Sequence, residues 1–291
     1  TGYPDNYGIS GTVNFKSEKF NLFTNQGYNY RNSPGNMINE TEYLNADNTT
    51  KNFVIEPRTN ERYGKGYNGN FGIELYLDKS TSWTNTINYR KNNGDNTDNV
   101  FQNYYDADYV YDYTRNRINE EDSDSENVEF TTNLTKNFKK DGHKLTIDGS
   151  FSTSDEINNA LVTDTANNSD SKKLDKTVNN QSQNRNLIQM DYVLPLGKGS
   201  QFEAGYRGDF NKLLTDYQVA NDGVINYNFT NTLEYKENVN ALYTQYGLKV
   251  NKISVLLGLR WEDSNIEVNQ LSTNDFNTKK YGNLFPSAFL T

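Results

Sequence analysis

The stretch QFEAGYRGDF, residues 201–210, alternates between two kinds of side chain. Its even-numbered positions carry Phe, Ala, Tyr, Gly and Phe, whereas its odd-numbered positions carry Gln, Glu, Gly, Arg and Asp. Successive side chains of a β-strand point to opposite faces, so a period of two predicts a strand with one apolar and one polar environment. The fold must therefore supply both environments to a single strand.

The same alternation recurs along the chain, whereas helical periodicity is absent almost everywhere. It covers residues 71–77, 128–134, 145–151, 188–196 and 253–261. We therefore expect an all-β protein.

The composition is too polar for an ordinary globular core. Only 33% of the 291 residues are hydrophobic, the net charge is -9, and 47 residues are Asn. Such values approach those of disordered chains, yet 22 Tyr and 15 Phe argue against disorder. A hollow membrane barrel resolves the conflict, because it needs apolar residues only on the outward side of each strand.

Several functional classes are disfavoured by what the sequence lacks. It has no cysteine for disulfides or thiolate metal sites, and its single histidine, His143, leaves no partner for a histidine-based metal site. No apolar run is long enough for a helical membrane span, and the acidic balance disfavours nucleic acid as a partner. We expect no catalytic residues, no metal, no cofactor and no enzymatic activity.

The connections between the expected strands alternate between short and long. Short turns are expected at Ser17–Lys19, Lys79–Thr81, Lys139–Gly142, Gly197–Ser200 and Asn251–Lys252. Long polar loops are expected at 32–66, 92–124, 155–182, 218–236 and 265–280. Short periplasmic turns and long extracellular loops are typical of outer-membrane barrels. The sequence thus predicts an antiparallel transmembrane β-barrel in the outer membrane of a Gram-negative bacterium.

About eleven strands are expected, from 7–17 to 281–291. An odd number of strands would leave two open edges, and an unmade backbone hydrogen bond in lipid is costly. We therefore expect residues 1–291 to be a partial barrel domain, an internal part of a larger barrel that lacks its plug domain and its C-terminal strands.

Two segments resemble the barrel of outer-membrane TonB-dependent receptors. GLRWEDSNIEV at 258–268 carries a G-x-R-x-E pattern, and YGNLFPSAFLT at 281–291 carries a Phe-Pro-Ser element. The residues that match are Gly258, Arg260, Glu262, Phe285, Pro286 and Ser287. The first 25 residues of the strand region, YGISGTVNFKSEKFNLFTNQGYNYR, are similar to an early barrel hairpin just beyond a plug.

This resemblance implies energy-coupled uptake of a ligand too large for porins, such as an iron chelate, cobalamin or a glycan. A full member would have about twice as many strands, a plug and an N-terminal coupling segment. Its partners would be outer-membrane lipid and lipopolysaccharide, the TonB energy-coupling system through the missing plug, and a possible surface lipoprotein. One alternative is a non-transporting surface barrel, acting as an adhesin or as a subunit of an envelope assembly. A third is a soluble extracellular β module.

Two groups of residues are candidates for function. Tyr104, Tyr105, Tyr109, Tyr111 and Tyr113 form a tyrosine-rich segment in an expected extracellular loop, where they would either bind a flat ligand such as a sugar or pair across a hairpin. Glu203, Arg207, Asp209, Arg260 and Glu262 are expected to face the lumen, where they would either contact a plug or permeant, or pair within the wall.

Two weaker signals have alternative explanations. The acidic residues Asp95, Asp98, Asp122 and Asp124 offer oxygen ligands for calcium but lack the spacing of a complete calcium loop, which favours solvated loops. The triplet at 164–166, Asp-Thr-Ala, resembles an O-glycan acceptor pattern of Gram-negative secreted proteins.

Overall fold

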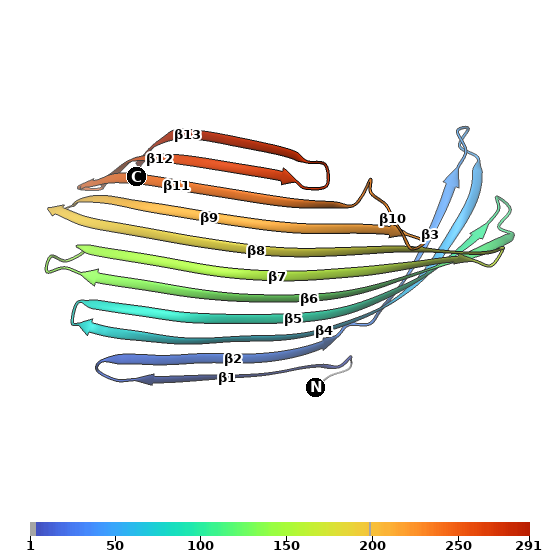
Figure 1. Ribbon diagram of the computed structural model, residues 1–291, viewed down its shortest axis with the longest axis horizontal. Helices are drawn as coiled ribbons and strands as arrows, with labels where there is room; N and C mark the ends of the chain where they lie inside the picture. Colours follow the sequence, from blue (N-terminus) through green and yellow to red (C-terminus); the bar gives the residue numbers. More distant parts are fainter. Residues whose placement is uncertain (1–3, 198) are drawn as a thin grey trace.

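The computed structural model describes residues 4–197 and 199–291, and its strands form one antiparallel sheet of 13 strands within these residues (Figure 1). The strands are β1 (Asn6–Lys16), β2 (Phe20–Asn32), β3 (Gly35–Leu44), β4 (Thr50–Asp78), β5 (Thr81–Tyr105), β6 (Tyr111–Asn137), β7 (Lys144–Ala166), β8 (Ser169–Gly197), β9 (Ser200–Asn221), β10 (Val224–Ile225), β11 (Asn231–Val250), β12 (Ile253–Gln270) and β13 (Asp275–Leu290). In this part of the chain, no helix has the length and apolar character needed to cross a membrane.

Eleven strands follow one another across the described sheet, in the order β1-β2-β4-β5-β6-β7-β8-β9-β11-β12-β13. The other two, β3 and β10, pair with β4 and β9. β2 and β3 run along successive parts of β4, with Asn32 opposite Tyr63 and Gly35 opposite Asn60. They are separated at Pro34, which has no amide hydrogen for the ladder. The predicted all-β antiparallel fold of about eleven strands is confirmed.

All five short turns predicted from the sequence lie at one end of the sheet, on the left in Figure 1. Gly142, Gly199 and Asn251 adopt positive φ angles of 74°, 82° and 56° in three of these turns. Glycine and asparagine tolerate this left-handed backbone better than other residues, which is why they mark tight turns. Lys198, within the fourth turn, lies outside the described residues, as do residues 1–3.

The long polar segments are mostly strand, and the prediction that they would be loops throughout is wrong. β5 continues to Tyr105 and β6 starts at Tyr111, while β7 ends at Ala166 and β8 starts at Ser169. Cross-strand hydrogen bonds satisfy the backbone in these segments whatever the side chains are. Where both faces of a strand meet water, apolar and polar residues no longer alternate, and the prediction relied on that alternation. β6 has 27 residues and is about 90 Å long. A strand needs only roughly 9–11 residues to cross a bilayer, so β6 is far longer than a membrane crossing requires.

The apolar positions of neighbouring strands lie on the same face of the sheet. Phe202 is opposite Leu194 on β8 and Tyr246 on β11, and Tyr206 is opposite Met190 and Leu242. The large apolar side chains that remain exposed on this face include Ile9, Val13, Phe71, Ile87, Phe130, Ile188, Met190, Leu242, Leu257, Leu259 and Leu284.

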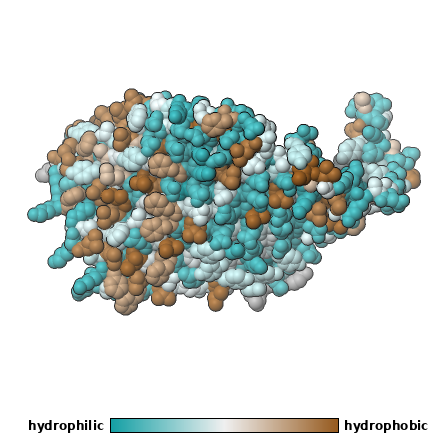
Figure 2. Space-filling view, viewed as in Figure 1, coloured by the Kyte–Doolittle hydropathy of each residue, from teal (hydrophilic) through white to brown (hydrophobic). Residues whose placement is uncertain are grey.

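Apolar residues gather toward the short-turn end of the molecule, as Figure 2 shows for one side. Leu242 is 54% exposed and Leu257 is 51% exposed, so no second layer of the described protein covers this face. A single sheet with such a face has the construction of a membrane β-barrel wall, whose outward residues meet lipid.

The described sheet has two free edges. β1 pairs with β2 alone, and β13 pairs with β12 alone. The prediction that residues 1–291 belong to a larger barrel is not tested by this arrangement and stays a prediction.

Candidate functional site

The five predicted charged residues lie on the polar face, opposite the apolar band. Arg207 on β9 is opposite Ala241 on β11, which in turn is opposite Glu262 on β12. Ala241 is fully buried between these long side chains, so the charged groups of β9 and β12 extend over a small residue. The register therefore brings Arg207 and Glu262 into one row.

Three arginines on this face, those nearest Asp209 and Glu262, are paired with carboxylates. Arg185 donates two hydrogen bonds to Asp209, at 3.0 and 2.7 Å, and Arg207 approaches the same carboxylate at 3.4 Å. Arg260 contacts Glu262 at 2.5 Å. A cavity of about 360 Å³ lies among these groups and also borders the Gln183, Asn211, Glu237 and Val239 side chains. A role in contacting a plug or a permeant remains a prediction for all five charged residues.

A tyrosine bridges three strands on the same face. The Tyr243 hydroxyl on β11 donates a hydrogen bond to the Asp191 carboxylate on β8, across the intervening Gly205 on β9. Gln189 donates a further bond to Asp191, at 2.8 Å. A side chain at position 205 would overlap the Tyr243 ring, so glycine is required for the bridge.

The two segments that resemble TonB-dependent receptors are direct neighbours. Gly258 is opposite Ser287, and Arg260 is opposite Phe285. A β-carbon at position 258 would lie 2.6 Å from the Ser287 hydroxyl oxygen, so the glycine allows the strands to pack closely. Both segments border a cavity of about 430 Å³ that Arg207 and Tyr243 also line.

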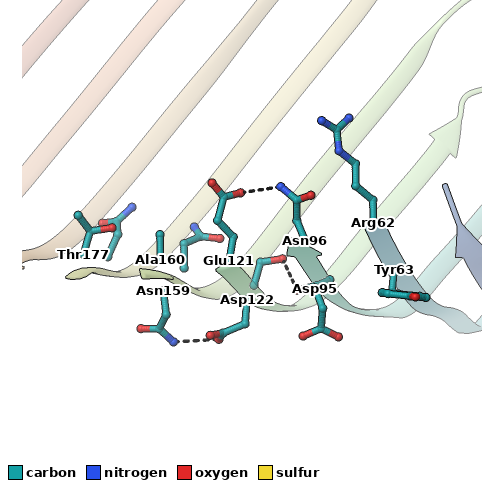
Figure 3. A pocket seen from close by; sticks show the side chains of 13 residues that line it. Arg62, Tyr63, Asp95, Asn96, Glu121, Asp122, Asn159, Ala160 and Thr177 are labelled. Carbon is teal, nitrogen blue, oxygen red and sulfur yellow. Dashed lines mark hydrogen bonds between the residues drawn. The ribbon is translucent and has the colours of Figure 1, made fainter. Parts of the chain in front are cut away.

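A further cavity, of about 470 Å³, lies on the polar face beyond the apolar band, where β4 to β8 are long (Figure 3). We call it the hairpin pocket. One row of residues crosses five strands there, each opposite the next: Arg62, Asn96, Glu121, Ala160 and Thr177. Figure 3 shows their side chains on one side of the sheet. Tyr63, Asp95, Asp122 and Asn159 point to the other side.

Small residues form the floor of the hairpin pocket. In the next row Gly64 is opposite Gly94, and Gly94 is opposite Ser123. Glycines have no side chain to cover the sheet, and Ala160 adds only a methyl group in the adjoining row. The longer side chains therefore stand as a rim around an exposed stretch of backbone.

The five predicted tyrosines do not form one surface. Tyr104 and Tyr113 are opposite each other, and their rings stack at 4.4 Å with an angle of 9°. A register shift follows, so that Tyr105 is opposite Tyr111 instead. Because side chains alternate between faces, the shift places Tyr105 and Tyr111 on the opposite side of the hairpin from the stacked pair.

Tyr109 joins the second group and connects two hairpins. Its ring lies 5.2 Å from that of Tyr105 and 4.7 Å from that of Phe53 on β4. Its hydroxyl donates a hydrogen bond of 2.6 Å to Glu40 on β3. This bond, followed by partial burial, raises the pKa of the Tyr109 hydroxyl. Part of the tyrosine surface is thus used in contacts within the protein, and ligand binding there stays a prediction.

Of the four acidic residues weighed as calcium ligands, Asp95 and Asp122 are directly opposite each other, and the other two lie beside cations. Asp98 is buried against Arg58 at 2.5 Å, and Lys91 lies 3.6 Å from Asp124. Among the described residues, no group of three or more His, Cys, Asp or Glu side chains is placed to hold a metal ion. Asp164, in the Asp-Thr-Ala triplet, is engaged by Arg115, and this hydrogen bond lowers the pKa of the carboxyl group.

Sequence reasoning missed the hairpin pocket. Its residues lie in segments that were expected to be loops, and nothing in the local sequence aligns Arg62 with Glu121. Only the register of three paired strands brings these side chains together. A local signal was the glycine at position 94 within NNGDNTDN, because a glycine inside a strand often marks a bulge or a place where another group approaches the backbone closely.

The fold and its two unlike faces define a transmembrane β-barrel protein. A family model for the outer membrane protein beta-barrel family matches residues 136–291, which is more than half of the chain. The chain therefore belongs to this family and lies in the outer membrane of a Gram-negative bacterium. The family match does not extend to TonB-dependent receptors specifically.

The other comparisons give less. The search of curated proteins gave no match. Among solved structures, the chain is similar to the outer membrane protease OmpT from Escherichia coli, with 10% identity, 90% of this chain and 95% of that chain covered, and a TM-score of 0.27.

The expectation that the chain has no enzymatic activity needs correction. A solved structure that the comparison found is that of an outer-membrane protease, which contradicts that expectation without assigning an activity to this chain. The low identity and TM-score carry no catalytic residue or substrate of that protease over to this chain.

Proposed function

We propose that this protein is the barrel part of an outer-membrane transporter of the TonB-dependent type, which takes up a ligand too large for porins by energy-coupled transport. The observation that carries the proposal is the set of ionised side chains on the polar face, within the strands that carry the apolar band. Arg207, Asp209 and Arg260 need water or another polar surface on their side of the sheet. A lumen filled by water or by a plug supplies it.

The paired motif segments support the transporter type. The Gly258 and Ser287 strands resemble adjacent strands of TonB-dependent receptors, and they are hydrogen-bonded neighbours in this sheet. The same proposal includes the domain organisation, in which further strands pair with the edges at β1 and β13 and a plug fills the lumen. Closure in this way would satisfy the backbone groups of both edges.

Gene deletion in the native host tests the proposal. Uptake of labelled ferric chelates, cobalamin and oligosaccharides is measured in wild-type and deletion strains, each with and without an uncoupler of the proton gradient. We expect the deletion to abolish uptake of one of these ligands and the uncoupler to abolish it equally in the wild type.

Two outcomes would contradict the proposal. Uptake that depends on the gene but resists the uncoupler would show passive diffusion. Unchanged uptake of every ligand would favour the surface-barrel alternative, in which the long hairpins serve adhesion or assembly.

A further inference from the structure

The tips of the β3–β4 and β5–β6 hairpins carry an aromatic surface on the face opposite the polar one. A row of residues crosses four strands there, each opposite the next: Glu42, Phe53, Tyr105 and Tyr111. Tyr109 lies against this row, with its ring 5.2 Å from that of Tyr105 and 4.7 Å from that of Phe53. We call the four aromatic residues the tip platform. Because neighbouring strands are about 4.8 Å apart, the row is roughly 14 Å long.

The tip platform is exposed and lies far from the apolar band. Tyr109 is 46% exposed and Tyr111 is 48% exposed, and the neighbouring Ile38, on the same face of β3 as Glu42, is 73% exposed. Along β6, Tyr111 is roughly 60 Å from Phe130 in the apolar band, whereas the hydrocarbon of a bilayer is only about 30 Å thick. Lipid therefore does not account for this surface. Contiguous exposed apolar patches often mark sites where another molecule binds.

Carboxylates border the tip platform. Glu40 accepts a hydrogen bond of 2.6 Å from the Tyr109 hydroxyl, and Glu42 accepts one of 2.6 Å from the Thr50 hydroxyl. Both donors are neutral, so they leave the charges of the two glutamates in place. The three hairpin tips at 36–56, 101–115 and 164–173 together carry nine acidic and four basic residues. The charge of this region is complementary to a cationic partner.

The arrangement of rings and carboxylates suits arginine in particular. A guanidinium group stacks on aromatic faces and also binds carboxylates through two parallel hydrogen bonds. The bond from Tyr109 places the Glu40 carboxylate at the edge of the Tyr109 ring. An arginine that stacks on this ring can therefore reach Glu40, whereas a lysine brings only a point charge.

We propose that the tip platform docks an arginine-bearing segment of a partner protein outside the membrane. A row of roughly 14 Å is longer than one small cation needs and matches about four residues of an extended peptide. The excess of carboxylates disfavours anionic occupants such as the phosphates of lipopolysaccharide. The inference goes beyond the proposed function and does not depend on transport.

Peptide binding to the purified full-length protein in detergent tests this inference. The probes are hexaarginine, hexalysine, hexaglutamate and maltohexaose, each titrated by isothermal calorimetry at physiological salt. We expect hexaarginine to bind most tightly and hexalysine to bind several-fold more weakly. Hexaglutamate and maltohexaose should not bind.

Two charge-matched double variants locate the binding. Glu40→Gln with Glu42→Gln removes both carboxylates beside the platform but keeps an oxygen that accepts from Tyr109 and from Thr50. The control, Glu120→Gln with Asp122→Asn, removes two exposed charges from the same face of β6 nearer the membrane. Loss of hydrogen bonds to charged groups weakens binding by roughly tenfold or more. We expect this loss of hexaarginine affinity in the tip variant, and a change below about twofold in the control.

A second pair of variants tests the role of the rings. Tyr111→Ala removes one ring of the platform, whereas Tyr43→Ala removes an exposed ring from the other face of β3. Loss of stacking should reduce the preference for hexaarginine over hexalysine by roughly two- to fivefold in Tyr111→Ala. The preference should be unchanged in Tyr43→Ala.

Each of three results would overturn the inference. Equal weakening by the two double variants would show a general attraction of cations to an acidic protein. Binding of maltohexaose that Tyr111→Ala abolishes would make the platform a sugar site. Absence of hexaarginine binding to the wild type would leave the platform without the proposed occupant.

Discussion

Tyr243 on β11 and Asp191 on β8 are joined by a hydrogen bond that passes over Gly205 on β9. The bond between the Tyr243 hydroxyl and the Asp191 carboxylate therefore links three neighbouring strands. In a single-layer sheet with no covering core, such lateral contacts on the polar face supplement the backbone ladder. The bridge is possible because the position between the two residues has no side chain.

Gly205→Ala tests the bridge. The new methyl group would displace the Tyr243 ring and break its bond to Asp191, at a cost on the order of 1 kcal/mol of unfolding free energy. Unfolding in urea is measured by the loss of heat-modifiable mobility on gels, and the urea concentration at its midpoint should fall. Gly247→Ala, on the same face of β11, meets only an ordinary 3.6 Å contact with Leu256 and is the matched control. Equal midpoints for the two variants would show that the bridge adds no stability.

The apolar face should not tolerate a charge. Leu242→Arg places a guanidinium on the face that we assign to lipid, where the cost is about 2–4 kcal/mol near the bilayer midplane. Gln245→Arg makes the same residue on the polar face of the same strand. We expect Leu242→Arg to lower folding yield into lipid vesicles and Gln245→Arg to leave it near wild type. Comparable yields would argue against a lipid-facing Leu242.

The Arg115–Asp164 pair predicts a response of the distal hairpins to acid. The pKa of Asp164 is lowered in the folded protein, so its stabilising effect is present above the ordinary carboxyl pKa of about 4 and is lost as pH falls through the lower folded value. Hydrogen exchange across 115–117 and 162–166, corrected for intrinsic rates, should speed up below that pH. In Asp164→Asn it should be fast already at pH 7. An acid-independent pattern in the wild type would refute the assignment.

Tyr109 is expected to hold the β3–β4 hairpin against the β5–β6 tip. Tyr109→Phe keeps the ring contact with Phe53 but removes the 2.6 Å hydrogen bond to Glu40. Hydrogen exchange in 36–44 and 50–56 should increase several-fold, consistent with loss of about 1 kcal/mol. Tyr43→Phe removes a hydroxyl from the same hairpin outside this contact and should not change exchange.

The sequence predicted the membrane part of the fold better than the part outside it. Leu194, Phe202 and Tyr246 follow the alternation because one side of each strand meets lipid, and the glycines and asparagines of the short turns mark where strands reverse. Beyond the membrane both faces of β5 and β6 meet water, so alternation no longer reveals a strand.

The candidate sites were harder to predict for a different reason. The tyrosine segment was noticed, but the register shift between Tyr104 and Tyr105 that divides it between two faces has no local sequence signature. The same holds for Arg62 and Glu121, since their proximity depends on how three strands align. The local pattern of the sequence identifies individual strands, whereas the side chains that form a site on a sheet are brought together by the pairing register of several strands.

The account depends most on the two environments of β9, and the absence of cysteine allows a clean measurement. Single cysteines at each non-glycine position from 201 to 210 are spin-labelled in the protein reconstituted in lipid vesicles, and the accessibility of each label to oxygen and to a water-soluble nickel chelate is compared. The account predicts that labels at 202, 204, 206 and 210 favour oxygen, which dissolves in hydrocarbon, and that labels at the odd positions favour the chelate. The same preference at even and odd positions would contradict it.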